Sequence, residues 1–138
     1  MTEDDLKKRT KQFALRVLKL VAALPKTVAG RTIGNQLARS STSVAANYRA
    51  ACRARSKIEF ISKLGIVEEE ADESALWLEL IIDGGLMKAA LVEPLWSEAD
   101  ELVAIITSSR KSAARTIVSS PGRAAVTRSK IANQKSKI

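Results

Sequence analysis

The stretch RSSTSVAANYRAACRARSKIEF, residues 39–60, decides how this chain folds. Its small and polar residues are typical of a loop, yet it contains no glycine or proline, and its apolar residues recur at helical spacing. We therefore predict a helix from Arg31 or Thr32 to Ala54 with an unusually small and polar core face. This face comprises Leu37, Ser41, Val44, Tyr48, Ala51 and Cys52, with Ser40 and Asn47 at its edge.

The end of the same stretch predicts the start of the next helix. Ser56 and Glu59 have the spacing of a capping box, in which the two residues exchange hydrogen bonds between side chain and backbone. The helix should end after Asp83, because the pair Gly84-Gly85 follows it. Because the first of these helices ends near Ala54 and the cap of the next lies at Ser56, a very tight turn is expected between them. The core stripe of the second one comprises Phe60, Leu64, Val67, Ala71, Ser74 and Leu78.

A further helix is predicted before this pair. It runs from Glu3 to Leu24, begins at a Thr2–Asp5 capping box and ends before Pro25. The linker PKTVAG follows and should close at Gly30. The core stripe of this helix comprises Leu6, Phe13, Val17, Leu20 and Leu24.

The last predicted helix begins near Val92 or Glu93, with Pro94 in its first turn, and fades near Ile117. Four helices joined by short connections indicate an all-α fold, an antiparallel up-down-up-down four-helix bundle. The core stripe of the last helix comprises Leu95, Ala99, Leu102, Ile106 and Ala113.

Charge is segregated along the chain. The net charge is +8, but residues 1–57 carry 13 basic and 3 acidic side chains, residues 58–101 carry 2 and 12, and residues 102–138 carry 8 and none. Such segregation indicates either pairing between parts of the fold or between subunits, or a basic surface for nucleic acid or an anionic membrane. The bundle is predicted to take residues 1–117, and residues 118–138 are predicted to form a disordered basic tail.

The sequence predicts no enzymatic activity. It contains no histidine, which removes the commonest general base and the commonest zinc and di-iron ligand. The acidic run Glu68–Glu73 points around most of a helical turn, so its carboxylates do not converge on one metal. Cys52 is expected to be a small buried apolar residue, and we find no phosphate-binding glycine loop. We therefore expect no catalytic, cofactor or metal site.

The sequence predicts neither export nor a membrane span. The single cysteine fits a reducing compartment, and the N-terminus MTEDDLKKRT lacks the apolar core of a signal peptide. No apolar run reaches the roughly 18 residues that a spanning helix needs. We expect a cytoplasmic protein with no membrane partner.

Polar side chains on the core face of the second helix need hydrogen-bond partners. Ser40, Ser41 and Ser43 can bond to carbonyl groups of their own helix. Asn47 is expected to bridge to a neighbouring helix.

A second apolar face is predicted on the third helix. Ile66, Trp77 and Leu80 cluster about 130° from its core stripe, and Trp96 lies about 100° from the stripe of the fourth helix. Exposed tryptophan and isoleucine in one patch indicate an interface, so we expect a homo-oligomer that buries these four residues. The alternative is a wide bundle core that absorbs them.

The arginines of the second helix have two candidate uses. Arg49 or Arg53 can pair with Glu69, Glu70 or Glu73 of the third helix, within a chain or between subunits. Alternatively, basic residues of the first two helices bind a polyanion, mainly through its phosphate backbone and with strong salt dependence. The candidate polyanion-binding residues are Arg39, Arg49, Arg53, Arg55, Lys7, Lys8 and Lys11.

Three stretches carry a resemblance to a known family: residues 37–81, the ALPKT of residues 23–27, and the ADELVAI of residues 99–105. In them the chain resembles the bacterial 23S rRNA-intervening-sequence protein family, which is related to the accessory variability proteins of diversity-generating retroelements. The resemblance implies an antiparallel four-helix bundle, assembly into a ring-like homopentamer and no enzymatic activity. It also implies that relatives assist a reverse transcriptase and bind nucleic acid through a basic surface.

Two functions from different classes follow. The first is a homo-oligomeric accessory factor that binds nucleic acid, chiefly RNA, through a basic surface. The alternative is a structural scaffold whose charges pair between subunits and which binds a protein partner, such as a reverse transcriptase, without touching nucleic acid. Charge reversal at Arg49 and Arg53 distinguishes the two.

Overall fold

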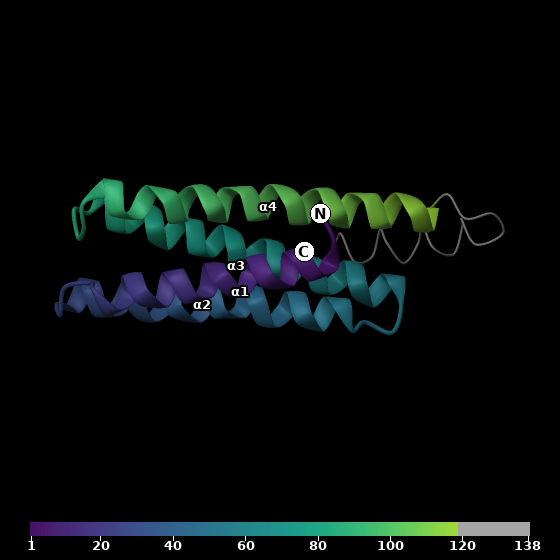
Figure 1. Ribbon diagram of the computed structural model, residues 1–138, viewed down its shortest axis with the longest axis horizontal. Coiled ribbons are helices and arrows are strands. Elements are labelled where there is room, and N and C mark those ends of the chain that lie inside the picture. The colour runs from purple at the N-terminus through teal and green to yellow at the C-terminus, as the bar shows by residue number, and fades with distance from the viewer. Residues whose placement is uncertain (119–138) are drawn as a thin grey trace.

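The computed structural model describes residues 1–118, which form four α-helices. They are α1 (Glu3–Ala22), α2 (Val28–Cys52), α3 (Lys57–Asp83) and α4 (Ala89–Val118). The helices lie along one long axis, with α1 and α2 in one layer and α3 and α4 in the other (Figure 1). Each helix packs against the next one in the chain, and α4 returns to contact α1. The predicted antiparallel four-helix bundle is confirmed, whereas the predicted tail lies outside the described residues beyond Val118.

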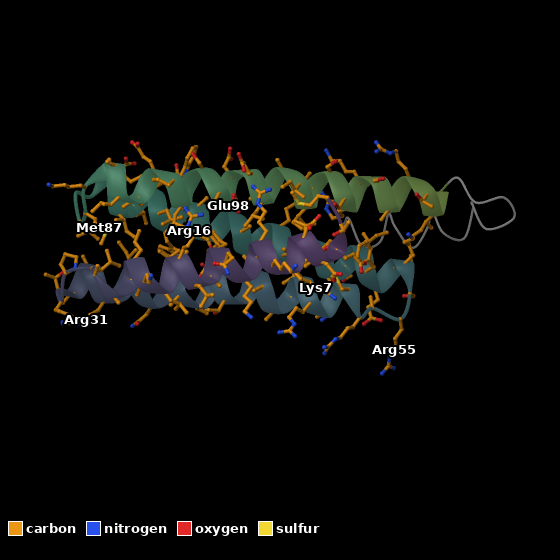
Figure 2. All side chains as sticks on the ribbon, in the orientation of Figure 1. Lys7, Arg16, Arg31, Arg55, Met87 and Glu98 are labelled. Carbon is orange, nitrogen blue, oxygen red and sulfur yellow. The ribbon has the colours of Figure 1, made fainter. Side chains whose placement is uncertain are left out.

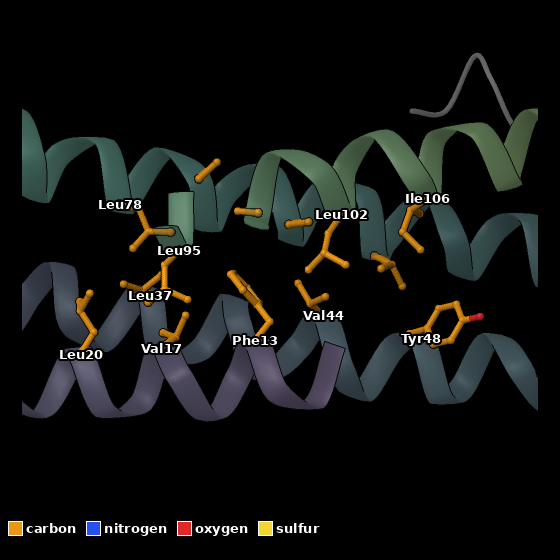
Figure 3. Close-up of a cluster of buried hydrophobic side chains, with 14 of the residues drawn as sticks. Phe13, Val17, Leu20, Leu37, Val44, Tyr48, Leu78, Leu95, Leu102 and Ile106 are labelled. Atoms are coloured by element: carbon orange, nitrogen blue, oxygen red, sulfur yellow. The ribbon is translucent and has the colours of Figure 1, made fainter. Parts of the chain in front are cut away.

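The core lies between the two layers. Side chains such as Phe13 of α1, Val44 of α2, Leu78 of α3 and Leu102 of α4 point into it and are fully buried (Figure 3). Burying each large apolar side chain stabilises the bundle by about 1.5–3 kcal/mol. The predicted stripes are buried except at Phe60 and Cys52, which are half-buried. The predicted stripes missed Thr10, Ala14, Ile61, Ala75, Ile81 and Val92.

Two of the helices begin at the predicted caps. The Thr2 hydroxyl accepts a hydrogen bond from the Asp5 N–H at 3.1 Å, and the Thr2 N–H donates to the Asp5 carboxylate at 3.0 Å. That bond from the Thr2 backbone holds the pKa of Asp5 below its usual value. At α3 the Ser56 hydroxyl accepts from the Glu59 N–H at 3.1 Å, but the Glu59 carboxylate accepts from the Arg55 N–H instead of from Ser56. Only half of that capping box forms.

The predicted start of α2 at Arg31 or Thr32 was wrong by one turn. The Thr27 hydroxyl accepts a hydrogen bond from the Gly30 N–H at 3.1 Å and caps the helix there. Gly30 therefore lies in the first turn instead of closing the loop. A Cβ atom at Gly30 would sit 2.0 Å from the Pro25 carbonyl oxygen, so the glycine is needed for this close approach.

The other boundaries differ by smaller amounts. α4 begins at Ala89, so Pro94 lies inside the helix and not in its first turn. The two alanines that open α4 favour the helical conformation, and the missing N–H of Pro94 leaves one carbonyl near the helix start without its usual donor. α1 ends at Ala22 and α2 at Cys52, two residues before the predicted ends, because the N–H groups of Leu24 and Ala54 close tighter turns at 3.1 Å.

Candidate nucleic-acid interface

Basic side chains gather where α2 turns into α3. Arg49, Arg53 and Arg55 line an open groove of about 790 Å³ together with Lys63 and Glu59. The small residues Ala46 and Ala50 also line it, which leaves it shallow and accessible. Figure 2 shows Arg55 pointing away from the turn into solvent. The groove thus holds four cations and one carboxylate.

Local sequence explains this gathering. Arg49 and Arg53 are four residues apart on α2 and so share one face of the helix. The Ser56 cap starts α3 at once, which brings its first two turns, with Glu59 and Lys63, back alongside the end of α2. All three arginines are exposed, and no ion pair involves them within residues 1–118.

The α1 lysines lie at the same end of the bundle but outside this groove. α1 begins beside the α2–α3 turn, where Glu3 lines a neighbouring depression with Cys52 and Arg55. Lys8 and Lys11 are exposed, whereas Lys7 is half-buried. The predicted polyanion-binding set therefore divides into a groove on α2–α3 and a separate row of lysines on α1.

Arg39, which the sequence grouped with the polyanion-binding residues, differs from the others because carboxylates hold it. Its guanidinium lies 3.1 Å from the Glu70 carboxylate and also pairs with Glu73. Burial raises the pKa of Glu70, an effect that Arg39 partly offsets and Glu73 reinforces. An ion pair between α2 and two of the predicted α3 carboxylates therefore exists, but its cation within the chain is Arg39 and not Arg49 or Arg53.

Hairpin register explains why Arg49 and Arg53 do not make this pair. The two helices run antiparallel from a turn at residues 53–56, so the last residues of α2 face the first residues of α3. Arg49 and Arg53 are level with Glu59 and Lys63, whereas Arg39 is far enough from the turn to reach Glu70 and Glu73. Glu69, the third candidate carboxylate, is exposed and forms no ion pair with any described residue. Counting outward from the Ser56 cap would have identified the right arginine.

Carboxylates of the acidic run on α3 pair with arginines of two neighbouring helices, α2 and α4. Glu68 accepts hydrogen bonds from Arg110 at 2.8 Å and from Thr107 at 2.5 Å, both on α4. Burial opposes ionisation of Glu68, but these bonds prevail and lower the pKa of its carboxyl. Carboxylates of this run therefore form ion pairs with both α2 and α4, and the partners on α4 were not predicted.

A third arginine joins the first and last helices. Arg9 of α1 donates two hydrogen bonds of 2.7 Å to Glu98 of α4 and also pairs with Glu101. The Glu98 bond, opposed by partial burial, raises the pKa of the Arg9 guanidinium, so it stays charged. Like Arg39 and Arg110, Arg9 is occupied inside the fold.

Hydroxyl groups satisfy one another inside the bundle. The Ser40 and Ser74 hydroxyls lie 2.8 Å apart and are fully buried, while Ser41 bonds to the Ala38 carbonyl at 3.3 Å. Asn47 was expected to bridge two helices but donates to the Ser43 carbonyl and hydroxyl, at 3.0 and 2.8 Å. Because Ser43 lies one turn away on α2, it reaches the Asn47 amide without crossing to another helix.

The four predicted interface residues do not form one exposed patch. Trp77 and Trp96 are half-buried and pack against the core, and each buried indole N–H has no hydrogen-bond partner among the described residues. Trp96 lines a depression of about 360 Å³ between α3 and α4. Trp77 lies one helical turn after Glu73, which pairs with Arg39 of α2, so it lies on the side of α3 that is closer to α2. Ile66 is half-buried, and only Leu80, at 40% exposure, faces solvent. The wide-core alternative therefore holds for both tryptophans.

The remaining chemistry of the described chain is limited. Burial raises the pKa of the Cys52 thiol, and the same cause raises the pKa of Tyr48 beside it. Within residues 1–118 we find no group of three or more acidic, cysteine or histidine side chains able to hold a metal ion. No helix of this region is long and apolar enough to cross a membrane.

Comparison with known proteins matches the fold and most of the chain. The family model of the 23S rRNA-intervening sequence protein matches residues 3–108. A crystal structure of a protein of unknown function from the S23 ribosomal protein family of Bacteroides thetaiotaomicron is 31% identical, with a TM-score of 0.72 over 80% of this chain and 99% of that chain. Comparison with curated proteins gives no match. This chain therefore belongs to the 23S rRNA-intervening sequence protein family.

Proposed function

We propose that this protein is a non-enzymatic accessory factor that binds RNA through the groove formed by Arg49, Arg53, Arg55 and Lys63. One observation carries the proposal. These arginines are exposed and in no ion pair of the described residues, whereas Arg9, Arg39 and Arg110 are held by carboxylates. Guanidinium groups that are free of carboxylates can each bind a phosphate with two hydrogen bonds.

The groove composition favours the backbone of the nucleic acid over its bases. No aromatic side chain lines the groove, so it offers no surface on which unpaired bases can stack. Four cations that neutralise four phosphates give a slope of about −3 for log affinity against log salt concentration. Affinity should then fall about 100-fold between 50 and 200 mM salt.

Salt-dependent RNA binding by two matched variants tests the proposal. In fluorescence anisotropy with a structured RNA, Arg49→Gln/Arg53→Gln should bind more weakly. Its salt slope should change from about −3 to about −1.5, because two of the four phosphate contacts are gone. Arg16→Gln, an exposed arginine on α1 outside the groove, is the control and should keep both values. Binding that is independent of salt, or equal in wild type and double variant, would refute the proposal.

The alternative function is a scaffold that binds a protein partner, such as a reverse transcriptase, in the bacterial cytoplasm. Exposed Leu76 and Leu80 on the acidic face of α3 favour it, because they offer an apolar contact. Under this alternative the groove variants would leave RNA affinity unchanged, and substitution of Leu76 and Leu80 would abolish partner binding.

A further inference from the structure

One carboxylate lines the basic groove without pairing with any of its cations. Glu59 is half-buried and shares the groove with Arg49, Arg53, Arg55 and Lys63, and no ion pair within residues 1–118 involves it. A carboxylate at this place repels the phosphates that the four cations attract. Charge alone therefore argues against Glu59 in a phosphate-binding groove, and its use there must be a different one.

The fold uses one carboxylate oxygen of Glu59 and leaves the other free. Oε2 accepts a hydrogen bond from the Arg55 backbone N–H at 3.1 Å, which holds the carboxylate at the first turn of α3. Oε1 has no hydrogen-bond partner among the described residues, so it can accept a hydrogen bond from a ligand in the groove.

An RNA strand carries a hydrogen-bond donor among its phosphates. Each ribose lies between two phosphates of its strand and bears a 2′-hydroxyl, which DNA lacks. Arg49 and Arg53 lie across the groove from Glu59, and Lys63 lies one turn beyond it on α3. A strand whose phosphates contact these cations would therefore bring a 2′-hydroxyl to the carboxylate among them.

We propose that the groove selects double-stranded RNA, and that Glu59 determines the choice of RNA over DNA by accepting a hydrogen bond from a 2′-hydroxyl. This inference rests on the RNA binding proposed above and names its substrate class. Duplex RNA is recognised mostly through phosphates and 2′-hydroxyls across its minor groove, which are the groups that these side chains can bind. Unpaired bases, by contrast, find no aromatic side chain in the groove on which to stack.

Chemically matched duplexes test the role of Glu59. Fluorescence anisotropy of the full chain compares an RNA duplex with the same duplex carrying 2′-fluoro riboses, which keep the RNA helix form but cannot donate a hydrogen bond. Wild type should bind the RNA duplex about 10-fold more tightly, because one hydrogen bond to a charged group is lost with fluorine. Glu59→Ala should bind the two duplexes equally. It should also bind the 2′-fluoro duplex more tightly than wild type does, because the repulsive charge is gone.

Two further variants separate the hydrogen bond from the charge. Glu59→Gln keeps an acceptor oxygen without the charge, so it should still prefer the RNA duplex. Glu3→Ala removes an exposed carboxylate that lines the neighbouring depression with Arg55, outside the groove, and should keep the wild-type preference. Circular dichroism checks that all variants keep wild-type helicity. Since the preference is a ratio measured on one protein, a general loss of affinity cannot imitate its loss.

The possible failures are distinguishable. Wild type that binds both duplexes equally, or Glu59→Ala that still prefers RNA, would overturn the role of Glu59 and leave RNA binding by the groove intact. Tighter binding of the single strand than of the duplex would overturn the choice of double-stranded RNA. Absence of binding to every one of these probes would overturn the proposed function itself, and this inference with it.

Discussion

The hydroxyl groups of Ser40 and Ser74 lie 2.8 Å apart in the fully buried seam between α2 and α3. Each hydroxyl also lies within hydrogen-bond distance of a carbonyl of its own helix, Leu37 at 3.3 Å and Glu70 at 2.9 Å. Adjacent to this contact, Arg39 reaches Glu70 and Glu73 at the surface. A buried polar pair and a surface ion pair therefore fix the same register of the hairpin.

Removing either hydroxyl should destabilise the bundle by about 1 kcal/mol, because one buried hydrogen bond is lost. The changes are Ser40→Ala, Ser74→Ala and their combination, measured by urea unfolding. The double variant should cost less than the two single variants together, with a coupling of about 0.5–1 kcal/mol. Additive losses would show that the two hydroxyls do not depend on each other, and Ser62→Ala, at an exposed serine of α3, is the control.

Arg39→Ala should reduce stability without changing RNA affinity. The Arg39 side chain is half-exposed, so solvent screens its pairs with Glu70 and Glu73 and their contribution to stability is small. Arg53→Ala should show the opposite pattern, with unchanged unfolding and weaker RNA binding, because Arg53 lies in the groove. Urea unfolding and anisotropy on the same two proteins measure both quantities. Weaker RNA binding by Arg39→Ala with full stability would return Arg39 to the binding surface.

The Glu68–Arg110 contact should make stability depend on acid pH. The pKa of Glu68 is lowered in the folded state, so this carboxylate stabilises the fold above its unfolded-state pKa. That contribution is lost as the pH falls through the lowered folded-state pKa. Glu68→Gln should therefore cost about 1–2 kcal/mol near neutral pH and almost nothing near pH 2.

Urea unfolding at a series of pH values measures this difference. Glu69→Gln is the matched control, because Glu69 is exposed on the same helix and in no ion pair with a described residue. A Glu68→Gln loss that stayed constant down to pH 2 would exclude the charged contact as its source.

Gly30→Ala should destabilise the bundle more than any of the single changes described above. Its Cβ atom would lie 2.0 Å from the Pro25 carbonyl oxygen, and relief requires the backbone of the α1–α2 connection to move. We expect a loss of about 3 kcal/mol in unfolding free energy. Gly34→Ala is the control, because its Cβ would meet side-chain atoms of Val21 and Leu24 at 3.2 and 3.3 Å. That change should stay within about 1 kcal/mol, since the side chains can shift and alanine favours the helix.

Helical periodicity predicts most of this fold because packing and local preference agree along the chain. The apolar stripe from Leu6 to Leu24 and the caps at Thr2 and Ser56 depend on neighbours a few residues away, which the sequence displays directly. The start of α2 was mispredicted because Gly30 was interpreted as the end of a loop, whereas it lies in the first helical turn, against the Pro25 carbonyl. Thr27, a favourable cap residue, was the local signal that was overlooked.

The site was predicted in part for the same reason. Residue type placed Arg49, Arg53 and Arg55 in the candidate binding set together with Arg39. Separating them from Arg39 requires the register between α2 and α3, which only the paired helices display. The tryptophans were predicted to be exposed because a helical wheel gives only the direction in which a side chain points. It does not show how far the neighbouring helices extend over that side chain, and here they partly cover both indoles.

The chain connects its helices in the order in which they pack, and this shapes how it folds. The α1–α4 contact joins distant parts of the sequence, and it is much smaller than the contacts between consecutive helices. Such low contact order favours folding within microseconds to milliseconds. α1 makes the least extensive contacts with the other helices, so its amide hydrogens should exchange with solvent before those of α3. The ion pair between Arg9 and Glu98 would then form last, when α1 docks on α4.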